Sequence, residues 1–549
     1  DSPTDNYGVM NPLDNGRPSN ITLSDGNLTA AFAGSGYSGG IRSSIFFDSE
    51  DSDGWYAECT LDSLAIASVF RAGVANASLN LASNDAQTSA DGWAYSDQGA
   101  KLNNSYTTSY GSSVGVGDVV GIAVRNGKIY FAVNNTWQGS ADPVTESNPA
   151  FSNLTGDVAF CQSTNTGGSY AHTATWNFGQ TGFTYTPPTG YKSLRVQDLP
   201  DPTIADPSAY FQTTLYTGNA STQEVNQSGN SNFEPGLVWI KTRSNAASHA
   251  LFDQVRGVNK QLRSDSTGTE YTAYSDLLTS FDADGFTLGA DATVNNVNVN
   301  TYTYAAWQWA ADGTSGSSNT DGSLTSTVSA DTTSGFSIAT YTGTGANATV
   351  GHGLGVAPSF VLVKSRNDTH DWYVWTPALA TTEFLKLNST AAKGTSSPEV
   401  WNSTAPTSSV VSLGTSIGVN RNTYNYVMYC FAEVEGFSKF GSFTGNGSST
   451  DGPFIYTGFK PEFFMWKRTD SGTYGDWTML DTKRDPFNMA QENLRANSTM
   501  AGDTGEANLD FVSNGIKHRG GTSARFNQSG ATYVYMAFAE SPFKTATAR

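Results

Sequence analysis

The side chains best suited to chemistry are few in this sequence and lie far apart. No two of the five histidines are separated by the two or four residues that a metal-binding pair needs. The chain also lacks the Gly-x-Ser-x-Gly motif of serine hydrolases and the glycine-rich motif of phosphate-binding loops. His370 and Asp371 form an isolated pair, which indicates a solvated turn. We therefore predict that the chain is not an enzyme and that it needs no cofactor and no metal.

Two acidic stretches, 51–54 and 282–285, begin like a calcium-binding loop, with the pattern Asp-x-Asp-Gly. A complete loop of the EF-hand type needs a glutamate at its twelfth position. That position holds Asp62 in the first stretch and Thr293 in the second, so we predict plain turns and leave a weak surface Ca²⁺ site open. Paired carboxylates for glycoside hydrolysis also stay open, because carboxylates about 5 to 10 Å apart need no proximity in the sequence.

Aromatic side chains on loops are better candidates for a site, because their rings stack on sugars or protein surfaces at a low cost in conformational entropy. Trp372 and Trp375 are set aside, since Trp477 aligns with Trp372 between two repeats of the chain and this predicts core positions. Turn-rich stretches outside the repeated motifs are preferred. The predicted ligand-binding residues are Tyr106, Tyr110, Tyr170, Tyr271, Tyr274 and Trp401.

The first of these tyrosines lie in a run of short predicted strands over residues 91–138. An almost continuous apolar run at 119–124 indicates a buried strand. Asn126-Gly127 is the strongest hairpin signal, because a type I′ turn needs φ > 0 at both central positions. Residues 128–133 then return as the partner strand. Further strands are predicted at 41–47, 55–61 and 69–74.

The stretch 117–137 (GDVVGIAVRNGKIYFAVNNTW) resembles the central hairpin of a SPRY domain. Residues 148–151 (NPAF) and 176–180 (WNFGQ) match later strands of that family, and 187–191 (PPTGY) matches its closing segment. The resemblance covers about residues 1–196. It implies a concanavalin-like β-sandwich that binds a partner through its loops, without catalysis. The alternative is another β-sandwich rich in Asn and Gly. The opening DSPTDN and the later Asn-Pro-Leu resemble SPRY-like domains of bacteriophage tail and virion proteins.

Beyond a proline-rich break at 198–203, the chain repeats itself three times. An apolar strand that starts with Pro and ends with Lys occurs at 235–241, 358–364 and 461–467. An aromatic-rich closing strand occurs at 304–310, 426–432 and 533–539. Units of about 100 residues are whole domains and too long for solenoid repeats. The predicted order is a SPRY-like sandwich (1–200), three tandem repeated β-sandwich domains (201–315, 332–435 and 436–549) and a Gly/Ser/Thr linker (316–331).

The Pro-started strand and the closing strand of each repeat are expected in the middle of one sandwich, buried on both faces. Their lysines (Lys241, Lys364 and Lys467) are predicted to be exposed at the strand end. Residues 312–331 have the composition of a flexible linker. The residues predicted to be core are Trp239, Trp309, Phe431, Trp466 and Phe538.

The first repeat, with its segments 251–257 (LFDQVRG) and 281–289 (FDADGFTLG), resembles a module of marine phage fibre-like proteins. The second repeat departs from this pattern, with Trp375-Thr376-Pro377 in place of the Asp-x-x-Arg-Gly segment. The third keeps the Asp and Arg but has Asp485 in place of the Gly. These departures put a shared ligand-binding role of the segment in doubt, whereas a shared structural role survives them.

Composition narrows the possible functions. The chain has 549 residues and a net charge of −19, from 49 acidic and 30 basic residues. This balance argues against binding nucleic acid through its phosphates and against an electrostatic membrane anchor. No apolar run approaches the length of a transmembrane helix. The prediction is therefore a protein with no nucleic-acid partner and no membrane insertion.

The three cysteines are widely spaced and form no Cys-x-x-Cys pair, so neither a zinc site nor a disulfide framework is predicted. Cys430 lies in an apolar run and is expected to be core. The chain starts at Asp1 without a Met, which suggests a processed chain or part of a longer one. Asn-x-Ser/Thr sequons are frequent, and in so polar a chain we interpret them as chance.

Together these observations predict a non-enzymatic bacteriophage structural protein, such as a tail fibre, a spike or a capsid-attached appendage. The expected location is the virion. The expected partners are a host cell-surface glycan or protein receptor and other virion proteins, and the phage resemblance suggests a homotrimer. The alternatives are a virion adaptor or decoration protein with a purely structural role, a secreted carbohydrate-binding lectin, and a glycan-active enzyme.

Overall fold

The structure is a computed structural model, and it describes residues 6–34, 39–82, 89–164, 171–291, 297–395, 398–504, 508–521 and 523–546. The chain divides into two compact units, Asp1–Asp201 and Pro202–Arg549, and this division falls inside the proline-rich break. Strands dominate both units, and the α-helix found in the described ranges is the four-residue α1 (Ile417–Asn420). The predicted all-β class is therefore confirmed.

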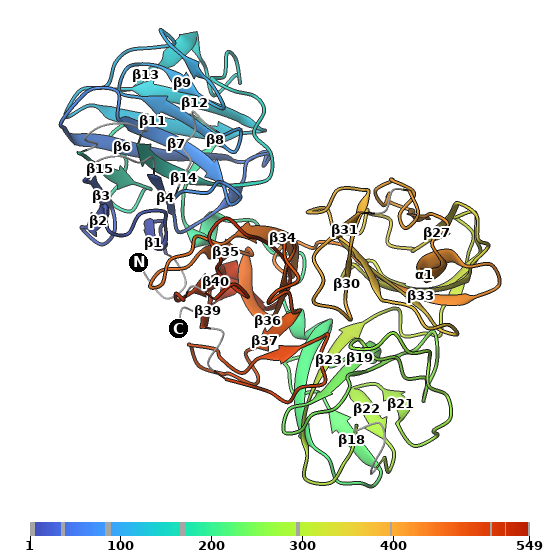
Figure 1. The fold of residues 1–549 in the computed structure, drawn as a ribbon. Helices are drawn as coiled ribbons and strands as arrows, with labels where there is room; N and C mark the ends of the chain where they lie inside the picture. Colours follow the sequence, from blue (N-terminus) through green and yellow to red (C-terminus); the bar gives the residue numbers. More distant parts are fainter. Residues whose placement is uncertain are drawn as a thin grey trace. The chain divides into compact units, whose positions relative to one another are not determined.

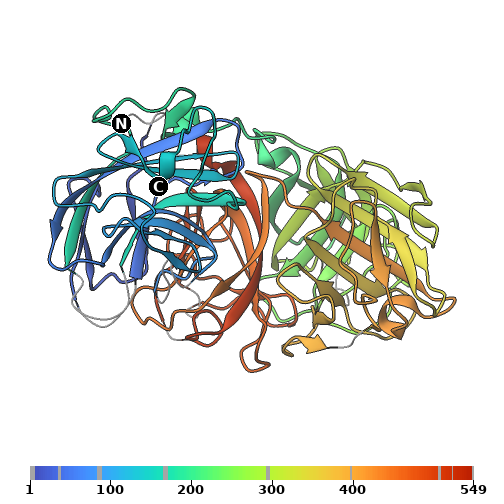
Figure 2. The same cartoon turned by 90° about the horizontal axis from the view of Figure 1, so that it is seen from above.

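The first unit is a sandwich of two eight-stranded sheets (Figure 1 and Figure 2). The first sheet contains β1 (Met10–Asn15), β4 (Gly39–Ser43), β5 (Phe47–Asp48), β7 (Phe70–Asn76), β8 (Gly92–Ser96), β9 (Lys101–Leu102), β10 (Tyr106–Thr107) and β14 (Asp157–Thr164). Its order is β1-β4-β14-β7-β8-β9-β10, with β5 paired to β14, so β10 forms one edge.

The second sheet contains β2 (Ile21–Ser24), β3 (Thr29–Phe32), β6 (Gly54–Leu64), β11 (Val119–Arg125), β12 (Lys128–Val133), β13 (Thr136–Trp137), β15 (His172–Asn177) and β16 (Tyr191–Ser193). Its order is β13-β12-β11-β6-β15-β3-β2, and β16 pairs with β6 in parallel. Short 3₁₀ turns follow at η1 (Gln138–Ser140) and η2 (Val196–Asp198). Aromatic rings fill the space between the sheets, where the ring centroids of Trp176 in the second sheet and Phe160 in the first are 6.2 Å apart.

The predicted hairpin is present, with β11 and β12 joined by Asn126-Gly127 and Arg125 paired with Lys128. Asn126 has φ 49° and Gly127 has φ 70°, as a type I′ turn requires. The strands predicted at 41–47, 55–61 and 69–74 correspond to β4, β6 and β7.

The second unit contains three repeats, each built on one large sheet. The first repeat has β17 (Phe211–Thr217), β23 (Thr303–Ala310), β19 (Pro235–Thr242) and β20 (Ala250–Asp253), in that spatial order. The second has β24 (Ser317–Asn319), β25 (Ser326–Asp331), β26 (Phe336–Thr342), β33 (Asn425–Phe431), β28 (Phe360–Ser365), β29 (Tyr373–Trp375), β30 (Glu383–Lys386) and β31 (Gly394–Thr395). The third has β34 (Ser438–Thr444), β41 (Thr532–Pro542), β36 (Phe459–Arg468), β37 (Thr478–Asp481) and β38 (Leu494–Arg495).

A small sheet accompanies each large one. The small sheets are β18 (Gln223–Asn226), β22 (Gly285–Leu288) and β21 (Leu278–Asp282) in the first repeat, β27 (Ala348–Gly351) and β32 (Val410–Leu413) in the second, and β35 (Phe454–Tyr456), β40 (Gly515–His518) and β39 (Leu509–Val512) in the third. The 3₁₀ turns η3 (Pro207–Ala209) and η4 (Phe543–Thr545) lie near the two ends of the unit's chain. One face of each large sheet packs with its small sheet around a private core.

The other faces of the three large sheets share a single core, which sequence reasoning does not predict. This shared core takes residues from all three repeats. At its centre lie Trp309, Phe431 and Phe538, one from each repeat, with ring centroids 5.6 to 6.1 Å apart. All five residues predicted to be core are 3% exposed or less. The repeats therefore form one body around a pseudo-threefold arrangement.

The predicted linker at 316–331 is wrong as a flexible segment. Its residues form β24 and β25, and β25 pairs along the whole edge of β26. The segment has small side chains. Within β25, Val328 lies between polar residues and is 6% exposed. Composition alone therefore mistook two paired strands for a spacer.

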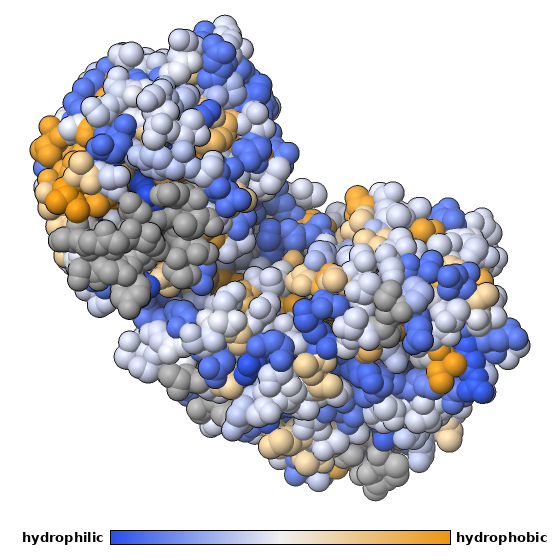
Figure 3. Space-filling view, turned by 45° about the horizontal axis from the view of Figure 1, so that its top comes forward, coloured by the Kyte–Doolittle hydropathy of each residue, from blue (hydrophilic) through white to orange (hydrophobic). Residues whose placement is uncertain are grey.

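The surface is mainly hydrophilic on the face shown in Figure 3, where hydrophobic residues occur in small groups. Within the described ranges, no helix is long and apolar enough to cross a membrane. All three cysteines, Cys59, Cys161 and Cys430, are buried, and Cys430 is fully inside the second repeat's core, as predicted.

Candidate binding site

Two of the predicted tyrosines lie at the edge of the first unit. Tyr106 stands in β10 and pairs with Leu102 of β9, against which its half-buried ring packs. Tyr110 follows in the same loop and is also half-buried. Lys101 of β9 lies next to Tyr110, with its ammonium 4.8 Å from the centre of the Tyr110 ring. Tyr106 does not join them, because it faces the other side of the sheet with its cross-strand partner Leu102.

Phe151 completes this group from a distant part of the sequence. The Lys101 ammonium lies 5.0 Å from the centre of the Phe151 ring and donates a hydrogen bond of 2.8 Å to the carbonyl of Ala150. A cation between two ring faces is attracted to both. Burial lowers the pKa of Lys101. We call Lys101, Tyr110 and Phe151 the aromatic platform.

Hydrogen bonds and ring packing hold the loop that carries Tyr110 in place. The Tyr110 hydroxyl donates to the carbonyl of Gln138 (3.2 Å), and the Gln138 side-chain oxygen accepts from the Ser112 amide (2.7 Å). The ring packs over Gly139, where a Cβ atom would lie 2.5 Å from Tyr110 Cε2. Tyr95 meets Tyr110 edge-on, with ring centres 6.2 Å apart. Sequence reasoning selected Tyr110 but missed Lys101, Gln138 and Phe151, because the fold alone brings them together.

The remaining predicted site residues do not join this group. In the first repeat, Tyr271 lies under the guanidinium of Arg263, 4.1 Å from its carbon, and Tyr274 packs against the private core. Trp401 is 3% exposed inside the second repeat's core, so it is not a loop aromatic presented to a ligand. Tyr170 lies outside the described residues.

The acidic stretches behave as turns. The amide of Asp53 donates to the carboxylate of Asp51 (3.0 Å), and the Thr287 hydroxyl donates to Asp282 (2.7 Å) across the β21–β22 hairpin. His370 contacts Asp368, at 3.1 Å. Over the ranges that the structure describes, no three His, Cys, Asp or Glu side chains come together as metal ligands.

The strand-end lysines are buried, contrary to the prediction that they are exposed. Lys241, Lys364 and Lys467 are all 0% exposed. Burial lowers the pKa of Lys241 and of Lys364 to about 8, and that of Lys467 to about 7. Each side chain runs from the end of its strand toward a loop of a neighbouring repeat, where a backbone carbonyl accepts its hydrogen bond.

These lysine contacts follow the pseudo-threefold arrangement. Lys241 of the first repeat donates to the carbonyl of Thr499 in the third, at 3.4 Å. Lys364 of the second repeat donates to Thr267 in the first, at 3.2 Å, and Lys467 of the third donates to Ser389 in the second, at 3.1 Å. The accepting loops share the pattern Arg/Lys-x-Asp/Asn-Ser-Thr at 263–267, 386–390 and 495–499. The lysines therefore bind the repeats to one another.

Two of the sequons belong to this loop pattern and are not chance. The side-chain oxygen of Asn388 accepts from the Trp372 amide (2.8 Å), and its amide group donates to Asp371 (2.8 Å). Asn497 does the same with the Trp477 amide (2.7 Å) and with Asp476 (2.9 Å).

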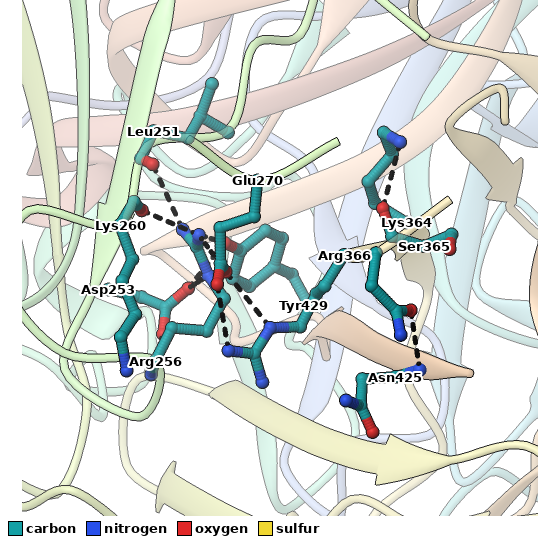
Figure 4. Close-up of polar contacts among 11 residues, drawn as sticks. Leu251, Asp253, Arg256, Lys260, Glu270, Lys364, Ser365, Arg366, Asn425 and Tyr429 are labelled. Atoms are coloured by element: carbon teal, nitrogen blue, oxygen red, sulfur yellow. Dashed lines mark hydrogen bonds and ion pairs between the residues drawn. The ribbon is translucent and has the colours of Figure 1, made fainter. Parts of the chain in front are cut away.

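A buried ion pair lies between the first and second repeats (Figure 4). Asp253 and Arg256, both 0% exposed, pair at 2.5 Å. Tyr429 of the second repeat donates its hydroxyl hydrogen to the same Asp253 carboxylate, at 2.7 Å. Glu270 then bridges Arg256 and Arg366 of the second repeat, at 3.0 Å from each. This interface is charged, desolvated and closed to solvent at its centre.

The same arrangement recurs between the first and third repeats. Asp481 and Arg484 pair at 2.6 Å, and Trp307 of the first repeat donates its indole N–H to Asp481, at 3.1 Å. Arg243 of the first repeat pairs with Glu492 of the third, at 2.7 Å. Both copies thus use an Asp-x-x-Arg segment and a donor from the neighbouring closing strand.

At the third interface, between the second and third repeats, neutral residues occupy the positions of the Asp, the Arg and their donor. Thr376 and Leu379 stand where the other repeats have Asp and Arg, and Met536 stands where they have Trp307 or Tyr429. Thr376, Leu379 and Met536 are 5% exposed or less, and the Thr376 hydroxyl finds no partner among the described residues. The departures that the sequence shows in the second repeat therefore occur together with a matching change in the third.

Glu462 couples the third repeat to the first and should make stability depend on pH. Its buried carboxyl accepts the Thr213 amide of the edge strand β17 (2.7 Å), and burial raises its pKa to about 7. The carboxyl pKa is higher in the folded protein than in the unfolded chain, so the protonated carboxyl stabilises the fold at pH values below the pKa of the unfolded chain. This stabilisation is lost as the pH rises from about 4.5 to 7. We expect Glu462→Gln, which keeps the acceptor oxygen, to be more stable than the parent by about 3 kcal/mol at pH 8.

The measurement is urea unfolding of the two proteins between pH 4 and pH 8. The curves should coincide near pH 4, where both side chains are neutral, and separate as the pH rises. A constant difference across this range would contradict a titrating Glu462.

A family model described as "Domain of unknown function (DUF7483)" matches residues 206–542. No curated protein matches the chain. Among solved structures, the chain is similar to the SPRY domain of human HERC1 (16% identity, TM-score 0.25, 30% of this chain and 96% of that one). A human SPRY domain is similar at 16% identity, with a TM-score of 0.22 and coverages of 29% and 95%.

The stonustoxin structure is similar at 13% identity, with a TM-score of 0.23, over 31% of this chain and 27% of that one. These scores describe a partial likeness. The β-sandwich predicted for the first unit is confirmed by that unit's own two sheets and the aromatic core between them.

Proposed function

Because residues 206–542 make this chain a member of the DUF7483 family, whose function is undefined, we propose its role from the residues themselves. The chain is a non-enzymatic bacteriophage virion protein, a fibre, spike or capsid-attached appendage that carries β-domains for attachment to the host surface. The phage-like segments of both units support this assignment. The observation that carries it is the aromatic platform, a rigid group of half-exposed rings on a loop-rich edge.

The distribution of charged groups supports binding over catalysis. The densest ionic clusters, around Arg256 and Arg484, lie between repeats with guanidiniums that are 0% exposed. A substrate cannot reach them. Tyr429 and Trp307 from neighbouring repeats donate to the paired aspartates, Asp253 and Asp481, so the clusters serve the stability of the second unit.

The location of the protein in the particle tests the proposal. We expect immunogold labelling of intact virions, with antibody to this chain, to mark the tail tip, fibres or capsid surface, and the purified chain to adsorb to host cells. Labelling without adsorption would favour an adaptor or decoration role. Absence from particles would overturn the virion assignment and favour a secreted lectin.

A further inference from the structure

We propose that the aromatic platform of the first unit binds a neutral glycan. This inference rests on the proposed attachment function and names the ligand of its site. The platform consists of Lys101, Tyr110 and Phe151, with the uncharged loop 102–116 beside it. Half-exposed rings offer apolar faces, and sugars stack their C–H faces on such rings.

The platform is preorganised, which lowers the entropic cost of binding. Lys101 joins Tyr110 to Phe151, and Gln138 and Tyr95 hold Tyr110 from behind. The neighbouring amides are also fixed, because Asn153 donates to Asn103 (3.1 Å) and accepts from the Trp93 indole (3.0 Å). A ligand therefore meets rings that already stand in place.

The polar side chains around the rings are suited to hydrogen bonding with sugar hydroxyls. Residues 102–116 contain no acidic or basic side chain. The exposed side chains of the loop that leads to Tyr110 end in hydroxyl or amide groups, which both donate and accept hydrogen bonds as sugar hydroxyls do. They are Asn104, Ser105, Thr107, Thr108 and Ser109.

Charge disfavours an acidic glycan. The protein carries a net charge of −19, so a polyanion approaches against repulsion. The platform's one cation, Lys101, faces two rings and donates to the carbonyl of Ala150, at 2.8 Å.

A peptide is a poorer match than a sugar. Strand addition needs a free edge of several residues. The edge strand β10 at the platform has two residues, Tyr106 and Thr107. The loop offers no charged group to fix the termini or side chains of a peptide.

The test is titration of the full chain with oligosaccharides of dextran, mannan, xylan and agarose, and with acidic alginate oligosaccharides, followed by calorimetry. We expect binding to at least one neutral glycan. Tyr110→Leu and Lys101→Met should each weaken it about tenfold or more, and Tyr110→Phe, which keeps the ring, less than threefold. Tyr474→Leu, at a 52% exposed tyrosine of the second unit, is the matched control and should change nothing.

Circular dichroism of each variant separates loss of binding from loss of fold. Binding to alginate alone, binding that Tyr110→Leu leaves intact, or no binding to any of the glycans would overturn the inference. Virions that label with antibody while the chain binds no neutral glycan would overturn this inference and leave the proposed function standing.

Discussion

Asp253→Thr should lower the free energy of unfolding of the second unit by about 3–5 kcal/mol. The substitution removes one of the two carboxylates that pair with Arg256, whose guanidinium is 0% exposed, and leaves Glu270 to pair with both Arg256 and Arg366. It also leaves the Tyr429 hydroxyl without its acceptor. A buried charge without its partner is among the most expensive changes that a protein interior can suffer, because burial removes the solvation that would otherwise stabilise it.

The third interface shows how the same position can be neutral. There, threonine, leucine and methionine occupy the places of Asp253, Arg256 and Tyr429, and all are buried. The triple variant Asp253→Thr/Arg256→Leu/Tyr429→Met copies that solution. We expect it to recover at least about 2 kcal/mol of the loss, because no charge remains without a partner.

Urea unfolding of the full chain, followed by tryptophan fluorescence, measures both variants. Arg256→Leu alone is the matched control, and it should also be less stable than the triple variant, because it leaves the Asp253 carboxylate buried without its cation. A triple variant as unstable as Asp253→Thr would contradict the idea that the three positions form one interchangeable set.

The strands of this protein can be predicted from the sequence because their apolar runs and turn residues are local signals. The hairpin at Asn126-Gly127 and the buried strands β19, β28 and β36 follow from such signals. The sequence near a buried strand does not indicate which element each of its two faces packs against. A strand that is apolar on both faces fits a self-contained sandwich as well as a sheet shared with two neighbours, so the shared core could not be predicted.

The strand-end lysines show the same limit. A lysine at the end of an apolar strand is usually solvated, and nothing beside Lys364 in the sequence indicates otherwise. Its acceptor, the carbonyl of Thr267, comes from another repeat, 97 residues away. The platform is similar, because Phe151 reaches Lys101 through the fold of the sandwich. Pattern reasoning finds aromatic loops, but it cannot find the partners that the fold delivers.

Trp309→Ala should destabilise all three repeats at once, by about 3–5 kcal/mol. The Trp309 ring contacts Phe211 of its own repeat, Phe431 of the second, and Phe463 and Phe538 of the third. Its removal opens a cavity at the point where the three large sheets meet. Since no repeat has a complete core without the other two, the whole unit should lose stability together.

Hydrogen exchange measured strand by strand in the full chain distinguishes this from three independent domains. Amides of β26 and β36 should exchange faster in Trp309→Ala by the same factor as those of β19, because all three strands then open through one global unfolding event. The exposed Tyr474→Leu is the control and should leave every strand unchanged. Faster exchange confined to residues 211–310 would mean that the first repeat unfolds alone, and the shared core would then be a contact between separate domains.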